Sequence, residues 1–78
     1  MSPEPITVIA YSGHRGEETP RTFFLHGQRI DVVEVLRMWV GEEPEGMRRR
    51  IYFEVKGNDG FVYRMFYDEG DREWFLDH

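Results

Sequence analysis

Aromatic rings and arginine side chains occur together in the C-terminal part of the chain. Rings on a strand surface can stack unpaired bases, and neighbouring guanidinium groups can neutralise phosphates. The same composition is typical of protein interfaces, where aromatic residues and arginine supply much of the binding energy. The candidate contact residues are Tyr52, Phe66 and Phe75 as rings, with Arg48, Arg50 and Arg64 as cations.

Histidine and carboxylate side chains give weaker signals. His14 and His26 can approach each other across neighbouring strands, and Glu17 or Glu18 can complete a metal site, but their spacing matches no ligand motif. The acidic segment 68–73 lacks the spacing of a calcium loop. A nucleophile with its base and oxyanion site is not indicated either. We therefore predict no catalytic residue, no metal and no cofactor, and a protein that is not an enzyme.

A β-hairpin is predicted to position the first of the candidate rings. Segments 51–56 and 61–67 are rich in β-branched and aromatic residues, and a Gly/Asn/Asp cluster separates them. A three-residue loop puts Gly60 at the position that needs positive φ, and it sets Tyr52 opposite Phe66. One face of the hairpin then carries Arg48, Arg50, Tyr52, Lys56, Arg64 and Phe66. The opposite face carries Ile51, Phe53, Val55, Tyr63, Met65 and Tyr67.

A second hairpin is predicted to follow directly. A four-residue loop over 69–72 sets Trp74 opposite Tyr67 and puts Phe75 beside Phe66 on the outer face. A three-residue loop would turn the whole strand over, because side chains alternate between faces with a period of two. The four-residue loop is preferred because it buries the tryptophan and pairs opposite charges across strands.

The first half of the chain is less clearly patterned. Residues 1–5 contain two prolines and suggest a frayed start, followed by a strand over 6–11. The polar, glycine-bracketed segment 12–20 reads as a loop, 21–26 as a second short strand, and Gly27-Gln28 as a tight turn.

Residues 30–40 admit two interpretations. Asp31 followed by Glu34 matches a helix capping box, and one helical face would hold Val32, Val35, Leu36 and Trp39. The valines of the same segment favour a strand instead, and the alternative is a long, bent one.

The chain resembles a group of small bacterial proteins of unknown function. The resemblance covers most of the chain through short elements: Tyr11-Ser12-Gly13, Arg15, Pro20, Phe23, Val35-Leu36-Arg37-Met38-Trp39, Phe53-x-Val55, Asp59-Gly60-x-x-Tyr63, Asp68 and Trp74-x-Leu76. Similar proteins look like compact antiparallel β domains, which favours a strand over 30–40. Arg37-Met38 stands where an acidic-basic pair is expected before the tryptophan. The resemblance implies no activity or cofactor.

Composition sets the outer limits. The 78 residues include 10 Lys and Arg against 15 Asp and Glu, which gives a net charge of −5 and disfavours non-specific attraction to phosphate backbones or anionic membranes. The chain has no cysteine, so no disulfide framework is expected. It shows no signal-peptide pattern and no apolar run long enough to cross a bilayer. A cytoplasmic protein without a membrane association is the expectation.

These observations predict one domain over 1–78, mainly all-β, with five or six antiparallel strands in a strongly twisted meander or small barrel. A short helix over 31–40 would make it α+β. The predicted function is a small non-enzymatic protein-interaction module that self-associates through the aromatic and arginine face. The alternative is a single-stranded nucleic-acid-binding module that uses the same face.

Overall fold

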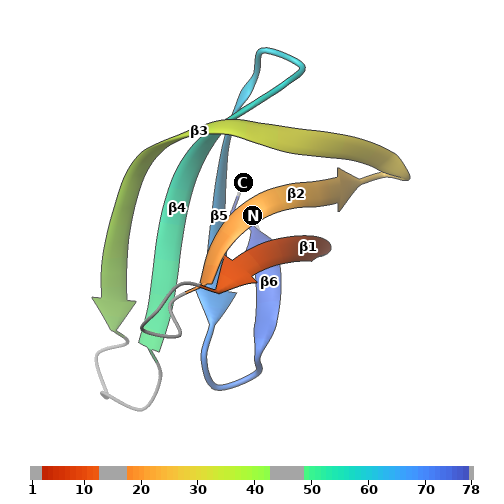
Figure 1. The fold of residues 1–78 in the computed structure, drawn as a ribbon. Helices are drawn as coiled ribbons and strands as arrows, with labels where there is room; N and C mark the ends of the chain where they lie inside the picture. The colour runs from red at the N-terminus through yellow and green to blue at the C-terminus, as the bar shows by residue number, and fades with distance from the viewer. Residues whose placement is uncertain (1–2, 13–17, 43–48, 78) are drawn as a thin grey trace.

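Six antiparallel strands, taken in chain order, close into a small barrel (Figure 1). The structure is a computed structural model and describes residues 3–12, 18–42 and 49–77. The first strand pairs with the last, which closes the barrel. The strands are β1 (Glu4–Ser12), β2 (Glu18–Leu25), β3 (Gln28–Glu42), β4 (Arg49–Gly57), β5 (Val62–Asp68) and β6 (Glu73–Leu76). The prediction of an all-β domain with five or six antiparallel strands is therefore confirmed, and the described residues contain no helix.

Both C-terminal hairpins have the predicted registers. Gly60 has a φ of 90°, and its N–H donates to the Gly57 carbonyl at 3.0 Å within the three-residue loop. Tyr52 lies opposite Phe66, as the loop length requires. In the second hairpin Tyr67 pairs with Trp74, so the four-residue loop is confirmed as well. Local turn chemistry was sufficient here because each turn fixes its own register.

Strand β3 settles the ambiguous segment, and the helical interpretation of 31–40 is wrong. Figure 1 shows β3 running first beside β2 and then curving away along β4. Its pairing with β4 shifts between Val32 and Glu34 and again between Val35 and Arg37. Each shift inserts a residue into β3, and such bulges bend and twist a strand. The bulges allow β3 to pair with β2 at its start and with β4 along the rest of its length.

Asp31 has a different role from helix capping. Its carboxylate accepts hydrogen bonds from Thr22 Oγ1 at 3.0 Å and Arg29 Nε at 3.1 Å. These bonds, with Arg29 contributing most, lower the pKa of the Asp31 carboxyl. Its backbone bonds to Asn58, which ties the β4–β5 turn to β3. Asp31 therefore joins β3 to β2 and to the β4–β5 turn instead of capping a helix.

The N-terminal strands correct several boundaries. β1 extends to Ser12 and β2 begins at Glu18, so both reach into the segment 12–20 that was predicted as a loop. Glu4 and Pro5, placed in the frayed start by the sequence, belong to β1 and pair with β6. The predicted turn at Gly27-Gln28 lies one residue earlier, at His26 and Gly27, whose φ angles are 51° and 79°. Positive φ at both central residues is the requirement of the hairpin turn that follows the natural twist of the strands.

Aromatic rings make up half of the buried core cluster. The buried cluster consists of Phe23, Ile30, Phe53, Val55, Met65 and Trp74. The rings of Phe53 and Trp74 lie 5.6 Å apart, and Phe23 meets the edge of Tyr63 at 5.0 Å. The hairpin face predicted to hold Phe53, Val55 and Met65 is thus the face that points into the barrel.

Tyr63 provides a pH-dependent test of the β4–β5 turn. Its hydroxyl donates to Asp59 Oδ2 at 2.5 Å, and this bond raises the pKa of Tyr63 to about 12 from 10.0. Since the fold favours the neutral phenol, the resulting stability is complete below pH 10 and is lost as the pH rises toward 12. In a phenolate absorbance titration, the difference between the native protein and Tyr63→Phe should have its midpoint near 12. Asp59→Ala should move that midpoint back toward 10, and a midpoint that stays in place would contradict the assignment.

Candidate protein-interaction surface

Four rings form a continuous row across the outer surface of the barrel. The register places Trp39, Tyr52, Phe66 and Phe75 side by side on β3, β4, β5 and β6. Neighbouring ring centroids are 5.3, 5.2 and 5.2 Å apart along this row. Trp39 and Tyr52 are nearly parallel, with 4° between their planes. The structure thus brings together the three rings singled out from the sequence and adds Trp39 as a fourth.

Arginine side chains lie over the ring row. The Arg50 guanidinium is 4.8 Å from the Phe66 ring centre, and Arg64 is 5.6 Å from that of Trp39. Arg37, which was not among the candidate residues, lies 4.8 Å from the same tryptophan ring. A cation over a ring face is attracted by the ring quadrupole. Each of these guanidinium groups therefore covers ring surface as well as carrying charge.

Burial differs sharply along the row. Phe66 is only 2% exposed, although its side chain points outward, because rings flank it on both sides and Arg50 lies over its face. Tyr52, Phe75 and Trp39 are each half-buried. The ring surface that remains accessible to a partner is therefore toward the two ends of the row. Phe66 and the rings beside it form a second, smaller apolar cluster outside the barrel core.

Gly41 makes room for Tyr52. A Cβ at this position would lie 2.8 Å from Tyr52 Cε1, because the tyrosine ring lies across the backbone of β3. A side-chain hydrogen bond with Tyr52 raises the pKa of Arg50, and a hydrogen bond with Asp68 raises it further by a smaller amount. Tyr52 is therefore held from both sides, by an open backbone position and by a guanidinium group.

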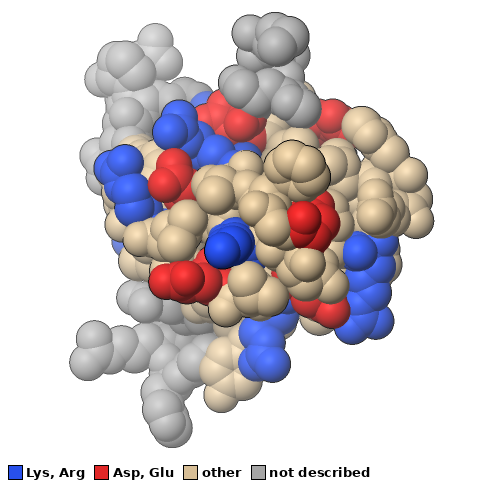
Figure 2. Space-filling model, turned by 90° about the horizontal axis from the view of Figure 1, so that it is seen from above, with Lys and Arg blue, Asp and Glu red and all other residues tan. Residues whose placement is uncertain are grey.

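Charged residues of both signs border the ring row on each side. One neighbouring row consists of Arg37, Glu54 and Arg64. Asp77 completes this row, since its N–H donates to the Arg64 carbonyl. The row on the other side runs Arg50, Asp68 and Glu73. Together the two rows hold three arginines and four carboxylates, and Arg64–Glu54 and Arg50–Asp68 form ion pairs at 3.6 and 3.2 Å. With these charges the ring-row face is close to neutral rather than basic. Figure 2, which views the molecule from above, shows basic and acidic side chains interspersed on that end as well.

Several sequence candidates lie elsewhere. Arg48, His14 and Glu17 are outside the described residues. His26 lies in the β2–β3 turn, where its Nε2 is 3.2 Å from Glu4 Oε2. Within the described ranges 3–12, 18–42 and 49–77, no group of three or more His, Cys, Asp or Glu side chains could hold a metal ion.

Strand β3 carries an apolar surface that the sequence reasoning missed. Five large apolar side chains along it are 38–59% exposed: Val33, Val35, Leu36, Met38 and Val40. Among the described residues, β2 pairs with β3 only as far as Asp31, and from Val32 onward β3 pairs with β4 alone. We call the other edge of this segment, with which no described strand pairs, the open edge of β3. The signal in the sequence is the density of apolar residues, which fits both the helix and the long, bent strand considered for residues 30–40.

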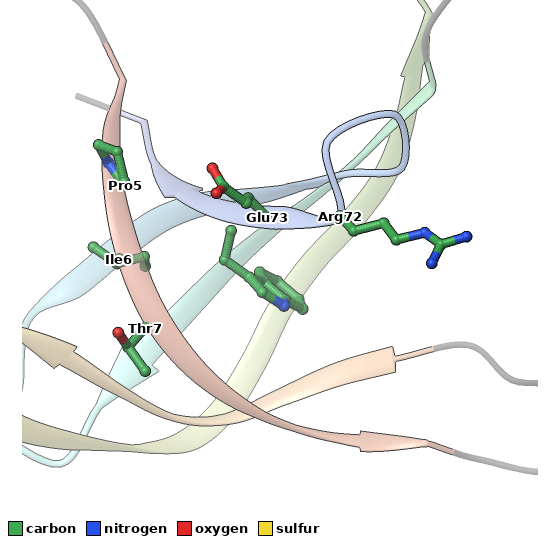
Figure 3. Close-up of a pocket in the computed structure, with 6 residues that line it drawn as sticks. Pro5, Ile6, Thr7, Arg72 and Glu73 are labelled. Carbon is green, nitrogen blue, oxygen red and sulfur yellow. The ribbon is translucent and has the colours of Figure 1, made fainter.

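A shallow groove of about 350 Å³ lies between β1 and β6 (Figure 3). Its lining residues are Pro5, Ile6, Thr7, Arg72, Glu73 and Trp74. It opens where the β1–β6 pairing ends at Ile6. Figure 3 shows the Arg72 side chain extending away from the groove, so the polar groups do not converge on one point as they do in most ligand sites.

Comparison with known proteins adds no function. No family model, no curated protein and no solved structure matches the chain. The structure therefore defines the class as a small six-stranded antiparallel barrel, and the functional argument rests on its surface. None of the described residues belongs to a helix that could cross a membrane.

Proposed function

We propose that this protein is a non-enzymatic protein-interaction module that binds its partner along β3. The observation that carries the proposal is the open edge of β3 after Asp31, with large apolar side chains exposed along it. An unpaired strand edge offers backbone N–H and C=O groups to another strand. Contiguous exposed apolar surface is typical of interaction sites rather than of isolated monomers.

The neighbouring ring row supports the same proposal. Trp39 and Tyr52 lie at the β3 end of the row, and Arg37 covers part of it. Aromatic residues and arginine at the centre of an interface contribute a large share of the binding energy. A partner strand along β3 would thus meet apolar side chains, a stacked ring pair and a guanidinium group on adjacent surface.

Single-stranded nucleic acid is the second candidate. The observation in its favour is the stacked Trp39–Tyr52 pair with two arginines over the tryptophan. The balanced charge rows favour protein over phosphate, because nucleic-acid affinity depends on an excess of cations that release counterions. Binding of a short oligonucleotide that weakens steeply with salt would support this candidate.

A charge on the open edge should abolish partner binding. Val40 is 45% exposed, so Val40→Glu should leave the fold intact and place a carboxylate in the interface. Burying an unpaired charge is costly, so we expect affinity to fall at least about tenfold. The measurement is a titration of the native protein and Val40→Glu against a purified protein partner captured from the source cells.

Val62→Glu is the matched control. It introduces the same charge at a valine that is 55% exposed on β5, away from the β3 edge. Its affinity should remain within about twofold of the native value, since surface changes outside an interface have small effects. Equal losses in the two variants, or no loss in either, would rule out β3 as the binding edge.

A further inference from the structure

We infer that the partner of the β3 edge is a second copy of this chain, paired antiparallel with β3 around a two-fold axis at Trp39. The inference rests on the proposed function, because it names the partner of the same edge. It follows from three properties of residues 37–41: their regular register, the alternation of their side chains, and the position of the ring row.

The register identifies the part of the edge that can pair. Both bulges of β3 lie before Arg37, and from there to Glu42 each residue pairs in sequence with β4. A regular segment can accept a second strand, whereas bulges interrupt pairing on an edge. The contact is thus confined to the segment that contains Met38, Trp39 and Val40.

Side-chain alternation then determines the centre of symmetry. Met38 and Val40 lie opposite Phe53 and Ile51 and so point to the core side, whereas Trp39 points outward. An axis at Trp39 sets Met38 of one copy opposite Val40 of the other, so apolar groups meet on the core side. Residues directly opposite each other in antiparallel strands point to the same face and pack together.

The outer face is complementary in the same register. Trp39 would face its own symmetry mate, and the ring row would continue without a break from one barrel into the other. Arg37 would lie opposite Gly41, which has no side chain and is covered by the Tyr52 ring. A guanidinium group of one copy would thus meet a tyrosine ring of the other, as Arg37 already meets Trp39 within one copy.

Neighbouring registers fit less well. An axis at Met38 sets Val40 opposite Leu36, where the second bulge interrupts regular pairing. An axis at Val40 sets Trp39 against Gly41, over which the Tyr52 ring already lies. The axis at Trp39 is the one that joins ring to ring and apolar residue to apolar residue.

Sedimentation velocity between about 10 µM and 1 mM, a range suited to a small interface, tests the association. The native chain and Val62→Glu should shift from monomer toward dimer as concentration rises, whereas Val40→Glu should remain monomeric. A native chain that is monomeric throughout would overturn the inference, as would a Val40→Glu protein that still dimerises.

Cysteine cross-linking tests the register directly, because the chain has no cysteine of its own. An equal mixture of Met38→Cys and Val40→Cys proteins should form a disulfide-linked dimer under mild oxidation. Either protein alone should form little, since its two cysteines would be diagonal neighbours, about 7 Å apart and beyond disulfide reach. Equal cross-linking in the mixture and in the single variants would overturn the axis at Trp39.

The two proposals fail in different ways. A monomeric native chain whose capture of another protein depends on Val40 would overturn the self-pairing and leave the interaction module standing. A dimer that persists in Val40→Glu, and that shows no preference for cross-linking in the cysteine mixture, would overturn the β3 axis and place the interface elsewhere. A monomeric chain with no β3-dependent partner would overturn both.

Discussion

Phe66→Ala should destabilise the protein by about 3 kcal/mol, even though Phe66 points away from the barrel interior. The side chain is 2% exposed and contacts the rings of Tyr52 and Phe75 on its two sides. Removing it would leave a void between these rings and expose the apolar face that Arg50 now covers. A domain of this size has a total stability of roughly 4–12 kcal/mol, at about 0.05–0.15 kcal/mol per residue. The loss is therefore a large fraction of the whole.

Urea unfolding measures this loss, and Phe61→Ala is the matched control. Phe61 is 66% exposed, so the same substitution there should change the free energy of unfolding by no more than about 0.5 kcal/mol. Similar small losses at the two positions would show that the ring row does not pack as described.

The result also governs how binding data are interpreted. A Phe66 variant that loses partner binding loses stability at the same time, so it does not identify a contact ring. Tyr52→Ala and Phe75→Ala remove the two half-buried rings that flank Phe66. They are better tests of whether the ring row contacts a partner.

Asp68→Ala should have an effect of similar size, about 2–4 kcal/mol. The carboxylate is 1% exposed, and its Oδ2 accepts from Arg50 Nε at 3.2 Å. Its Oδ1 accepts the backbone N–H groups of Gly70 and Asp71 at 2.9 and 3.0 Å, which orders the β5–β6 turn. Loss of the carboxylate would remove a partner from Arg50 and from two backbone donors at once.

Two further variants separate these contributions in the same unfolding measurement. Asp68→Asn keeps an oxygen for the turn and loses the ion pair, so its loss should be intermediate. Glu69→Ala removes an exposed pair with Arg49 at 3.8 Å and should change stability by no more than about 0.5 kcal/mol. If Asp68→Ala were as mild as Glu69→Ala, the buried carboxylate would not be holding the turn.

The candidate site was predictable from the sequence where local rules were enough. Gly60 and the four-residue loop 69–72 fix the two C-terminal registers, and these registers place Tyr52, Phe66 and Phe75 in one row. Turn geometry depends on a few neighbouring residues, so it can be worked out without the rest of the fold.

The sequence pattern of β3 was misleading for a physical reason. Val32 and Val35 lie on the same side of the sheet but are three residues apart, because the first bulge adds one residue between them. This spacing matches part of a helix face, whereas the other two members of the predicted helix face do not join them: Leu36 is the extra residue of the second bulge, and Trp39 points to the outer side. A bulge has little local signature, since it depends on how two distant strand pairings are joined.

Sequence alone determined the strands of the C-terminal hairpins, their faces, and the absence of thiol chemistry. Tertiary structure decided that Phe66 is covered, that carboxylates interleave with the arginines, and that β3 leaves an edge open. The physical reason is that register is a local property of turns, whereas burial and edge pairing depend on which distant strands come to lie beside a given face.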